Sequence, residues 1–405
     1  MKVLVVPMSA IAETAGPFSR CKKISEALAA ANIEVATCIA EDVNYKKIEG
    51  INNYFLDIPM PFGLPKFIAS RTFPIAQKLG ITSRKTVNSF DQVLLFTGNL
   101  DYNYLKKSVE SIRKAIKDFN PDIVYSEFNI SAFIAAKVEG KKIYATVSYP
   151  TQHEYANNPK LSKGLNKLLS ELNISPVESA LKLFDWADKC FCPSIKELEP
   201  MEKEKVIFCG SLNKINSVKD ISENNKNREN DTNENSNNEN NDKNKEKNKI
   251  LVYMGNGTIS ASLMVKEISE AFSESPYDVY IASQYVTEKT KGNIHIAKRW
   301  DFNQLLDESV LYINHGGQNS IIDGLLHGVP QLLVPGKVFE RRYNANSIVN
   351  NHAGALLSHH DFRASNIFQQ AETLIHSDEI KENAKKLGKM LESQGGIETI
   401  INNMK

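Results

Sequence analysis

The segment Val310–Ser320 reads VLYINHGGQNS, and it decides how the rest of the chain is interpreted. It begins as an apolar run typical of a buried parallel strand. The glycines Gly316 and Gly317 follow, and Asn319 and Ser320 stand at the start of a helical pattern. A strand that passes through a glycine pair into a helix N-terminus offers free backbone amides to an anion, and the glycines let a phosphate approach closely. Taken alone, the glycine pair favours the simpler interpretation of a glycine turn before a helix capped by Asn or Ser, so further motifs are needed.

The alternation of strand and helix recurs on both sides of this segment and indicates an α/β protein. We expect strands at 2–6, 35–39, 54–58, 122–126, 143–148, 189–192, 206–209, 250–254, 279–282, 294–297, 310–314, 331–334 and 355–357. We expect a first helix that ends near residue 32. Further helices are expected at 100–119, 130–139, 160–186, 262–272, 303–306, 319–327, 341–351, 363–376 and 379–393. The proline-rich stretch 59–92 is predicted to be irregular.

The strand pattern forms two groups, so the 405 residues are predicted to fold as two Rossmann-like domains. We place the first domain at residues 1–215 and the second at 250–390, followed by a C-terminal helix or tail at 391–405. Residues 216–249 are almost entirely Asn, Lys, Glu, Asp and Ser. Such a segment buries too little apolar surface to offset its chain entropy, so we predict a disordered linker insertion.

The composition excludes several classes of protein. A net charge of +1, with 41% hydrophobic and 24% charged residues, gives no basic field for nucleic acid or for an anionic membrane. The five cysteines are scattered, so we expect them to be reduced and structural. The opening apolar run is too short for a signal peptide and Pro7 ends it, so we expect a cytoplasmic protein without an integral membrane segment. Peripheral contact with a membrane through a helix face stays open.

Further motifs surround the central segment at fixed spacing. Arg299-Trp300 precedes it, and Gly328–Pro335 and Phe339–Ala345 follow it. In order and spacing, residues 299–357 resemble the donor-binding region of family 1 glycosyltransferases, the UDP-glycosyltransferase-like group of the GT-B superfamily, of the bacterial macrolide and natural-product type. The resemblance is weaker but collinear over the rest of the chain, the Asn-rich insertion excepted.

The resemblance implies the GT-B fold, an α/β architecture of two doubly wound Rossmann-like domains that face each other across a cleft. It also implies an enzyme that inverts the anomeric centre while it moves a sugar from a UDP- or dTDP-sugar to a small-molecule or lipid acceptor. The nucleotide sugar is then a co-substrate, and no cofactor or metal is expected. The absence of an Asp-x-Asp near a strand end of the second domain agrees with a metal-independent reaction.

The resemblance also assigns donor-binding positions. It implies base stacking by Trp300, with Phe302 as the alternative, and contact of Glu340 with donor-sugar hydroxyls. The positions that match the diphosphate-binding part of the family are His315, Gly316, Gly317, Asn319 and Ser320, together with the turn Asn256, Gly257 and Thr258. The chain departs from the family in two places: Asn303-Gln304 is the nearest match to a Pro-Gln pair, and Arg341 replaces the Gln that usually follows the acid.

The acceptor side lacks the usual general base of the family, because Pro17 occupies the position of its histidine. Glu127, Glu13 and His153 are the candidates to take the proton, and a carboxylate would need a raised pKa in the closed cleft. An acceptor that is itself acidic, such as a phenol, thiol or carboxylate, would need little help.

Two other functions stay open at this point. The missing histidine motivates an inactive, transferase-like auxiliary protein that binds nucleotide sugar or a partner transferase. A sugar-nucleotide epimerase would keep the fold and change the reaction, although the segment Glu340–Ala345 argues mildly against it.

Overall fold

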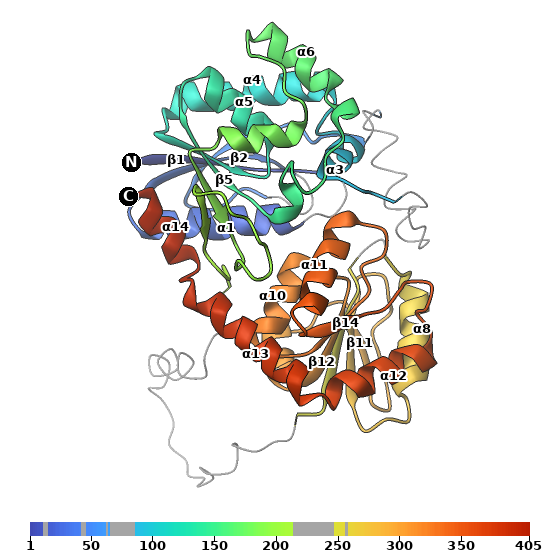
Figure 1. Ribbon diagram of the computed structural model, residues 1–405. Helices are drawn as coiled ribbons and strands as arrows, with labels where there is room; N and C mark the ends of the chain where they lie inside the picture. The colour runs from blue at the N-terminus through green and yellow to red at the C-terminus, as the bar shows by residue number, and fades with distance from the viewer. Residues whose placement is uncertain (11–14, 42–45, 62–63, 65–85, 214–246, 256–257) are drawn as a thin grey trace, which may run out of the picture.

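The computed structural model describes residues 1–10, 15–41, 46–61, 64, 86–213, 247–255 and 258–405. Two seven-stranded sheets, each flanked by helices, form the two halves of the molecule (Figure 1). Most of the predicted insertion, residues 214–246, lies outside the described residues, as do Glu13, Asn256, Gly257 and residues 65–85 of the irregular stretch.

The first sheet has the strand order β3-β2-β1-β4-β5-β6-β7, and all its pairings are parallel. Its strands are β1 (Lys2–Pro7), β2 (Glu34–Ala40), β3 (Asn52–Leu56), β4 (Ile123–Glu127), β5 (Lys142–Thr146), β6 (Lys189–Cys192) and β7 (Val206–Phe208). Its helices are α1 (Ala15–Ala30), α3 (Phe90–Thr97), α4 (Tyr102–Phe119), α5 (Ile130–Val138) and α6 (Lys163–Glu171), with the 3-10 turns η2 (Tyr149–Thr151), η3 (Pro159–Leu161) and η4 (Ala180–Trp186).

The second sheet has the order β10-β11-β9-β8-β12-β13-β14 and is parallel except at its β10 edge. Its strands are β8 (Lys249–Tyr253), β9 (Asp278–Ala282), β10 (Lys289–Lys291), β11 (Ile294–Ala297), β12 (Ser309–Asn314), β13 (Gln331–Leu333) and β14 (Gly354–Leu356). The helices that follow along the chain are α8 (Ala261–Phe272), α9 (Phe302–Asp307), α10 (Gln318–Leu326), α11 (Phe339–Asn350), α12 (Ala364–Ile375), α13 (Asp378–Ser393) and α14 (Ile397–Met404).

The doubly wound α/β prediction is confirmed, with differences in three places. Strand β10 was not predicted, because its three residues are all exposed and carry no apolar pattern. Helix α3 lies at the end of the stretch predicted to be irregular, where Ser89 caps it by accepting a hydrogen bond from the backbone N–H of Gln92. The predicted helix 160–186 is instead α6 with short 3-10 turns on either side.

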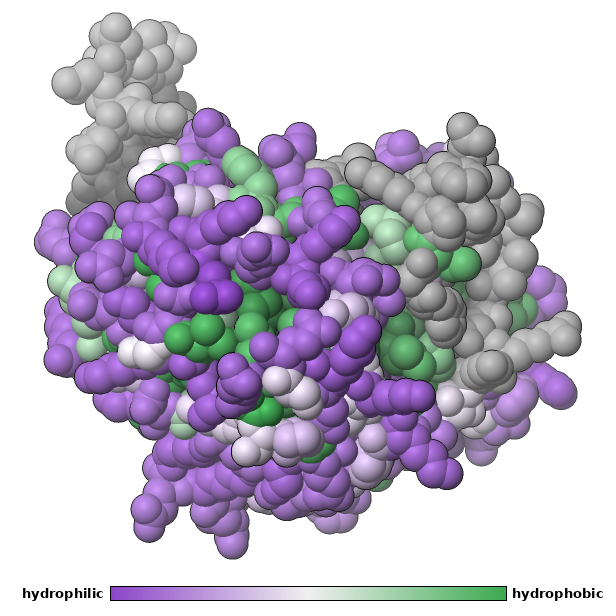
Figure 2. All heavy atoms as spheres, turned by 90° about the horizontal axis from the view of Figure 1, so that it is seen from above, coloured by the Kyte–Doolittle hydropathy of each residue, from purple (hydrophilic) through white to green (hydrophobic). Residues whose placement is uncertain are grey.

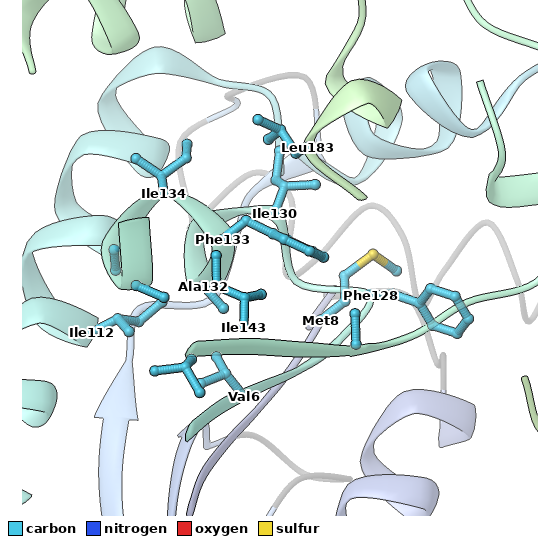
Figure 3. Close-up of a cluster of buried hydrophobic side chains, with 14 of the residues drawn as sticks. Val6, Met8, Ile112, Phe128, Ile130, Ala132, Phe133, Ile134, Ile143 and Leu183 are labelled. Carbon is cyan, nitrogen blue, oxygen red and sulfur yellow. The ribbon is translucent and has the colours of Figure 1, made fainter. Parts of the chain in front are cut away.

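Apolar side chains from both faces of the first sheet form its core. Val6, Met8 and Phe128 belong to the same buried cluster as Ile130 and Phe133 of the α5 segment (Figure 3). Helix α4 buries one apolar stripe against this core and exposes its lysines to solvent. The face of the molecule seen in Figure 2 is mostly hydrophilic. All five cysteines are buried and unpaired.

Within the described ranges, no helix is both long and apolar enough to cross a membrane.

The C-terminal helices join the two halves. Helix α13 packs against α10 of the second half, and the chain then crosses to the first half, where α14 packs against α1 (Figure 1). Ile400, Ile401 and Met404 are buried in the same cluster as the core residues of β1. The crossing is close, because a Cβ at Gly210 would lie only 2.0 Å from the carbonyl oxygen of Leu391.

Glu199 connects three segments from both halves. Its carboxylate accepts hydrogen bonds from the backbone N–H of Tyr149 and, at 3.0 Å, from Nε2 of Gln318 in α10. The carbonyl oxygen of the neighbouring Leu198 accepts from the hydroxyl groups of Tyr343 and Ser347 on α11. The side chain of Glu199 is buried, and this burial raises its pKa from 4.5 to about 8, with Glu340 adding to the rise and the two hydrogen bonds opposing it.

We expect Glu199→Gln to change the pH dependence of stability. The folded protein keeps the proton of Glu199 in a range where the unfolded chain releases it, so this residue lowers stability as pH rises from 4.5 to about 8. Relative to wild type, the variant should therefore gain up to about 1.4 kcal/mol of unfolding free energy per pH unit within that window. Denaturant unfolding at several pH values measures the difference.

Glu202→Gln is the matched control, because this nearby glutamate is exposed and pairs only loosely, at 3.5 Å, with Lys196. A difference between Glu199→Gln and wild type that stays constant with pH would contradict the titration of Glu199.

Candidate active site

The turn from β12 into α10 is held by buried polar side chains. Asn314 accepts a hydrogen bond from the backbone N–H of Gly316 at 2.9 Å and donates one to Oε1 of Gln331, also at 2.9 Å. Nδ2 of Asn344 donates to the carbonyl oxygen of Gly316. Sequence reasoning missed these three residues, although a polar residue at the end of an apolar strand, as Asn314 is, was the available signal.

Both glycines of this turn are required by geometry. Gly316 has φ 77, a left-handed conformation, and a Cβ there would lie 2.8 Å from the carbonyl oxygen of Arg341. A Cβ at Gly317 would lie 2.6 Å from Nε2 of His315. The backbone amides at the start of α10 follow directly, with Asn319 exposed and Ser320 buried.

His315 lies between this turn and the end of β8. Its ring is edge-on to Tyr253, with centroids 5.5 Å apart, and Nδ1 is 3.4 Å from the carbonyl oxygen of Tyr253. Burial and the neighbouring guanidinium of Arg341 lower the pKa of His315 to about 3. The ring is therefore neutral, and the contact to Tyr253 assigns its proton to Nδ1. Donation from Nε2 to a phosphate oxygen, as expected from the sequence, then requires a second proton, which an anionic ligand favours.

The two candidate stacking residues have different surroundings. The indole N–H of Trp300 donates to the carbonyl oxygen of Ile281 at 3.1 Å, and its ring is edge-on to Tyr280. Phe302 contacts Tyr253 with centroids 5.3 Å apart, and Tyr253 in turn contacts His315. The structure thus connects Phe302, more directly than Trp300, to the turn that carries His315.

The first turn of α11 brings a charged pair to the same edge. Nη1 of Arg341 donates to Oγ1 of Thr258 at 2.8 Å, so α11 contacts the turn after β8. Glu340 is half-buried; burial raises its pKa, while Arg20 and Arg341 oppose the rise. The structure therefore brings together His315, Thr258 and Glu340 from the predicted donor site. Of that predicted turn, Asn256 and Gly257 lie outside the described residues.

On the opposite side, Glu127 ends β4 and forms a buried ion pair with Arg20 of α1. Nε of Arg20 lies 2.5 Å from Oε1 of Glu127, while Oε2 has no hydrogen-bond partner among the described residues. Burial raises the pKa of Glu127; Arg20 and the nearby Thr146 hydroxyl oppose the rise without cancelling it. The next residue, Phe128, has φ 60, a strained conformation for a non-glycine residue of the kind that gathers at functional sites.

His153 has partners of its own. Its Nε2 lies 3.2 Å from Glu178, its Nδ1 lies 4.0 Å from Glu154, and it belongs to the segment after η2. Glu13, the third candidate base, lies outside the described residues. Among the described residues, no group of three or more His, Cys, Asp or Glu could hold a metal ion.

The two halves of the molecule meet near the site in two places. The first is a small cavity between α1 and α10, which is lined by Ser19, Arg20 and Lys23 on one side and by Gln318 and Asn319 on the other.

At the second place, aromatic rings of the two halves contact one another. Tyr343 of α11 lies 5.3 Å from Tyr149 and 5.0 Å from Tyr155, centroid to centroid, and Phe339 lies 6.4 Å from Tyr155. Rings from both domains therefore pack against one another where the two halves meet, with Phe339 buried.

Comparisons with known proteins find several glycosyltransferases that are similar to this chain. Residues 279–403 match the family model described as erythromycin biosynthesis protein CIII-like, C-terminal domain. The NDP-glycosyltransferase YjiC of Bacillus subtilis (strain 168) is 21% identical over 302 residues, which cover 73% of this chain and 75% of that protein. The UDP-glucuronosyltransferase 3A1 of Xenopus laevis is 29% identical over 158 residues, covering 37% of this chain and 30% of its own length.

Solved structures show the same fold over the whole chain. CalG4, the calicheamicin glycosyltransferase, superposes with a TM-score of 0.72 at 15% identity, covering 100% of this chain and 97% of that one. The spinosyn rhamnosyltransferase SpnG, complexed with thymidine diphosphate, gives a TM-score of 0.67 at 13% identity and covers 100% of both chains. Together these comparisons indicate a glycosyltransferase with the GT-B fold, whose residues 279–403 are similar to the EryCIII-like C-terminal domain.

Proposed function

We propose that this glycosyltransferase moves a sugar from a UDP- or dTDP-sugar to a small-molecule or lipid hydroxyl group, with inversion at the anomeric carbon. The observation that carries the proposal is the meeting of the His315–Gly317 turn, Thr258 and Arg341 at the carboxyl ends of β8 and β12. Ligands of doubly wound sheets bind at this edge. The thymidine diphosphate in the similar SpnG structure supports a nucleoside diphosphate as the leaving group.

The donor would lie with its diphosphate against the start of α10. The backbone amides that follow Gly317 have no intrahelical partners there, and the helix dipole favours negative charge. Glu340 lies on the same side and can accept hydrogen bonds from sugar hydroxyls. Fixed donors of this kind stabilise charge that develops on a leaving group without reorganisation.

The acceptor would enter from the first domain, along the aromatic wall of Tyr149, Tyr155, Phe339 and Tyr343. Rings offer apolar area and little conformational entropy loss, which suits a flat or apolar aglycone. A second SpnG structure is complexed with spinosyn aglycone, which supports a small-molecule acceptor of this character. Because donor and acceptor come from opposite domains, the acceptor oxygen can attack the face of the anomeric carbon opposite the leaving diphosphate.

Glu127 is the residue we propose as general base. Oε1 is fixed by Arg20, and the buried Oε2, which has no hydrogen-bond partner among the described residues, would accept the proton of the acceptor hydroxyl as the acceptor oxygen bonds to the anomeric carbon. The bond from that carbon to the diphosphate breaks, and the nucleoside diphosphate leaves with the electron pair. A buried carboxylate oxygen without a partner is costly, and a substrate hydroxyl would remove that cost. The raised pKa of Glu127 makes it a stronger base than an ordinary glutamate.

Nucleotide binding tests the donor half of this proposal. Thermal shifts with UDP, dTDP and their sugar derivatives should reveal a selective ligand, because a ligand that binds only the folded state raises Tm. His315→Ala should weaken that ligand about tenfold or more, since it removes a ring from the diphosphate turn. The exposed His376 at the C-terminal end of α12 provides the control His376→Ala. Equal shifts in both variants would remove His315 from the site.

Substitution of Glu127 tests the acceptor half. Glu127→Gln keeps a hydrogen-bond acceptor for Arg20 and should lower kcat about 10²- to 10⁴-fold while nucleotide affinity stays unchanged. In wild type, kcat should rise as pH rises through the raised pKa of Glu127, because only the carboxylate accepts a proton; the variant should lose this rise.

The control for Glu127→Gln is Glu139→Gln, which changes another Arg–Glu pair of the same domain, with Arg113 at 2.6 Å. It should cost some stability and leave kcat unchanged. Near-normal turnover by Glu127→Gln would assign Glu127 to structure alone. Nucleotide binding without turnover in wild type, over a broad acceptor pool, would favour the auxiliary binding protein.

A further inference from the structure

Arg341 contacts both turns that would flank the diphosphate. Its Nη1 donates to Oγ1 of Thr258, in the turn after β8. Its carbonyl oxygen lies 2.8 Å from the position of a Cβ at Gly316, so its backbone packs against the turn after β12. Asn344, one helical turn further along α11, donates to the carbonyl oxygen of Gly316 and fixes this packing.

Of the two side chains His315 and Arg341, only Arg341 carries a charge in the free protein. His315 is neutral in the free protein, because burial and Arg341 disfavour its protonation. The guanidinium of Arg341 keeps its charge at any ordinary pH. A nucleoside diphosphate gains negative charge as the glycosidic bond breaks, and that charge is best stabilised by a cation that is already in place. Of these two side chains, Arg341 supplies it.

We propose that Arg341 binds the β-phosphate of the donor and stabilises the charge on the departing nucleoside diphosphate. The inference rests on the proposed function and adds a residue to it. When the phosphate binds, Nη1 exchanges or shares its contact with the Thr258 hydroxyl, and both groups then donate to phosphate oxygens. A planar guanidinium suits this task better than an ammonium, since it donates two parallel hydrogen bonds to one phosphate.

The adjacent arginine has a different role and provides a matched control. Nη2 of Arg342 donates to the carbonyl oxygen of Val87 and to Oδ1 of Asn88, both at 3.1 Å, so it joins α11 to the first domain. Arg342→Gln removes the same charge from the same helical turn without touching Thr258 or the His315 turn. Any effect of net charge or of helix stability should appear in both variants.

The experiment compares ligands that differ by one phosphate. Calorimetric Kd values for UDP, UMP and uridine, for the thymidine series and for a UDP-uronate are measured with wild type, Arg341→Gln, Arg341→Lys and Arg342→Gln. Arg341→Gln should weaken the diphosphate about 10- to 100-fold and the monophosphate and nucleoside less than about threefold. Arg341→Lys should recover part of the loss, and Arg342→Gln should leave every ratio unchanged. In turnover, Arg341→Gln should lower kcat as well as raise KM.

Three results would overturn the inference. An unchanged ratio of diphosphate to monophosphate affinity in Arg341→Gln would show that Arg341 does not bind the β-phosphate. A selective loss of a nucleotide uronate, with the bare diphosphate unaffected, would assign the guanidinium to a carboxylate of the donor sugar. Failure of wild type to bind any of these nucleotides would overturn the proposed function itself, and the wild-type measurement distinguishes that failure from the other two.

Discussion

The guanidinium of Arg20 lies among carboxylates that both halves of the molecule contribute. It pairs with Glu127 from β4, and it lowers the pKa values of Glu199, between the two domains, and of Glu340 on α11. Buried carboxylates without a cation nearby would be too costly to keep charged, so the cleft depends on this residue. Even so, desolvation outweighs the effect of Arg20 at all three glutamates, and the pKa of each is raised above its ordinary value.

The relative position of the two halves affects the surroundings of these charged groups. Glu199 accepts hydrogen bonds from the backbone N–H of Tyr149 in the first domain and from the side chain of Gln318 at the start of α10. Helix α14 returns to the first domain and packs against α1, the helix that carries Arg20. A movement of one half relative to the other therefore alters the surroundings of the same few charged groups.

On the proposed donor side, neutral and charged groups have different roles. His315 is held neutral and fixed by Tyr253, so it shapes the turn and offers a ring nitrogen, while Arg341 offers charge. The backbone amides of α10 add direction without a titratable group. Such a division would suit the diphosphate of the proposed donor in a desolvated cleft.

The sequence by itself determined the order of strands and helices, the two-domain α/β architecture, and the turn at His315–Ser320. These follow from local patterns: apolar runs of strand length, helical periodicity, and glycines next to a helix start. The spacing of Trp300 and Glu340 around that turn extended the prediction to a donor site, because these residues are close along the chain. The exposed strand β10 was not predicted, because its residues show no apolar alternation.

Only the tertiary structure decided which distant side chains meet. Arg20 and Glu127 are 107 residues apart, and Arg341 and Thr258 are 83 apart, so no local pattern connects either pair. Sequence reasoning named Glu127 as a base but did not assign Arg20 as its partner, and it treated Arg341 as a lost amide rather than a gained cation. The reason is physical: charge and burial act through space, and their effect on a carboxyl or an imidazole is set by neighbours that the fold, not the chain order, supplies.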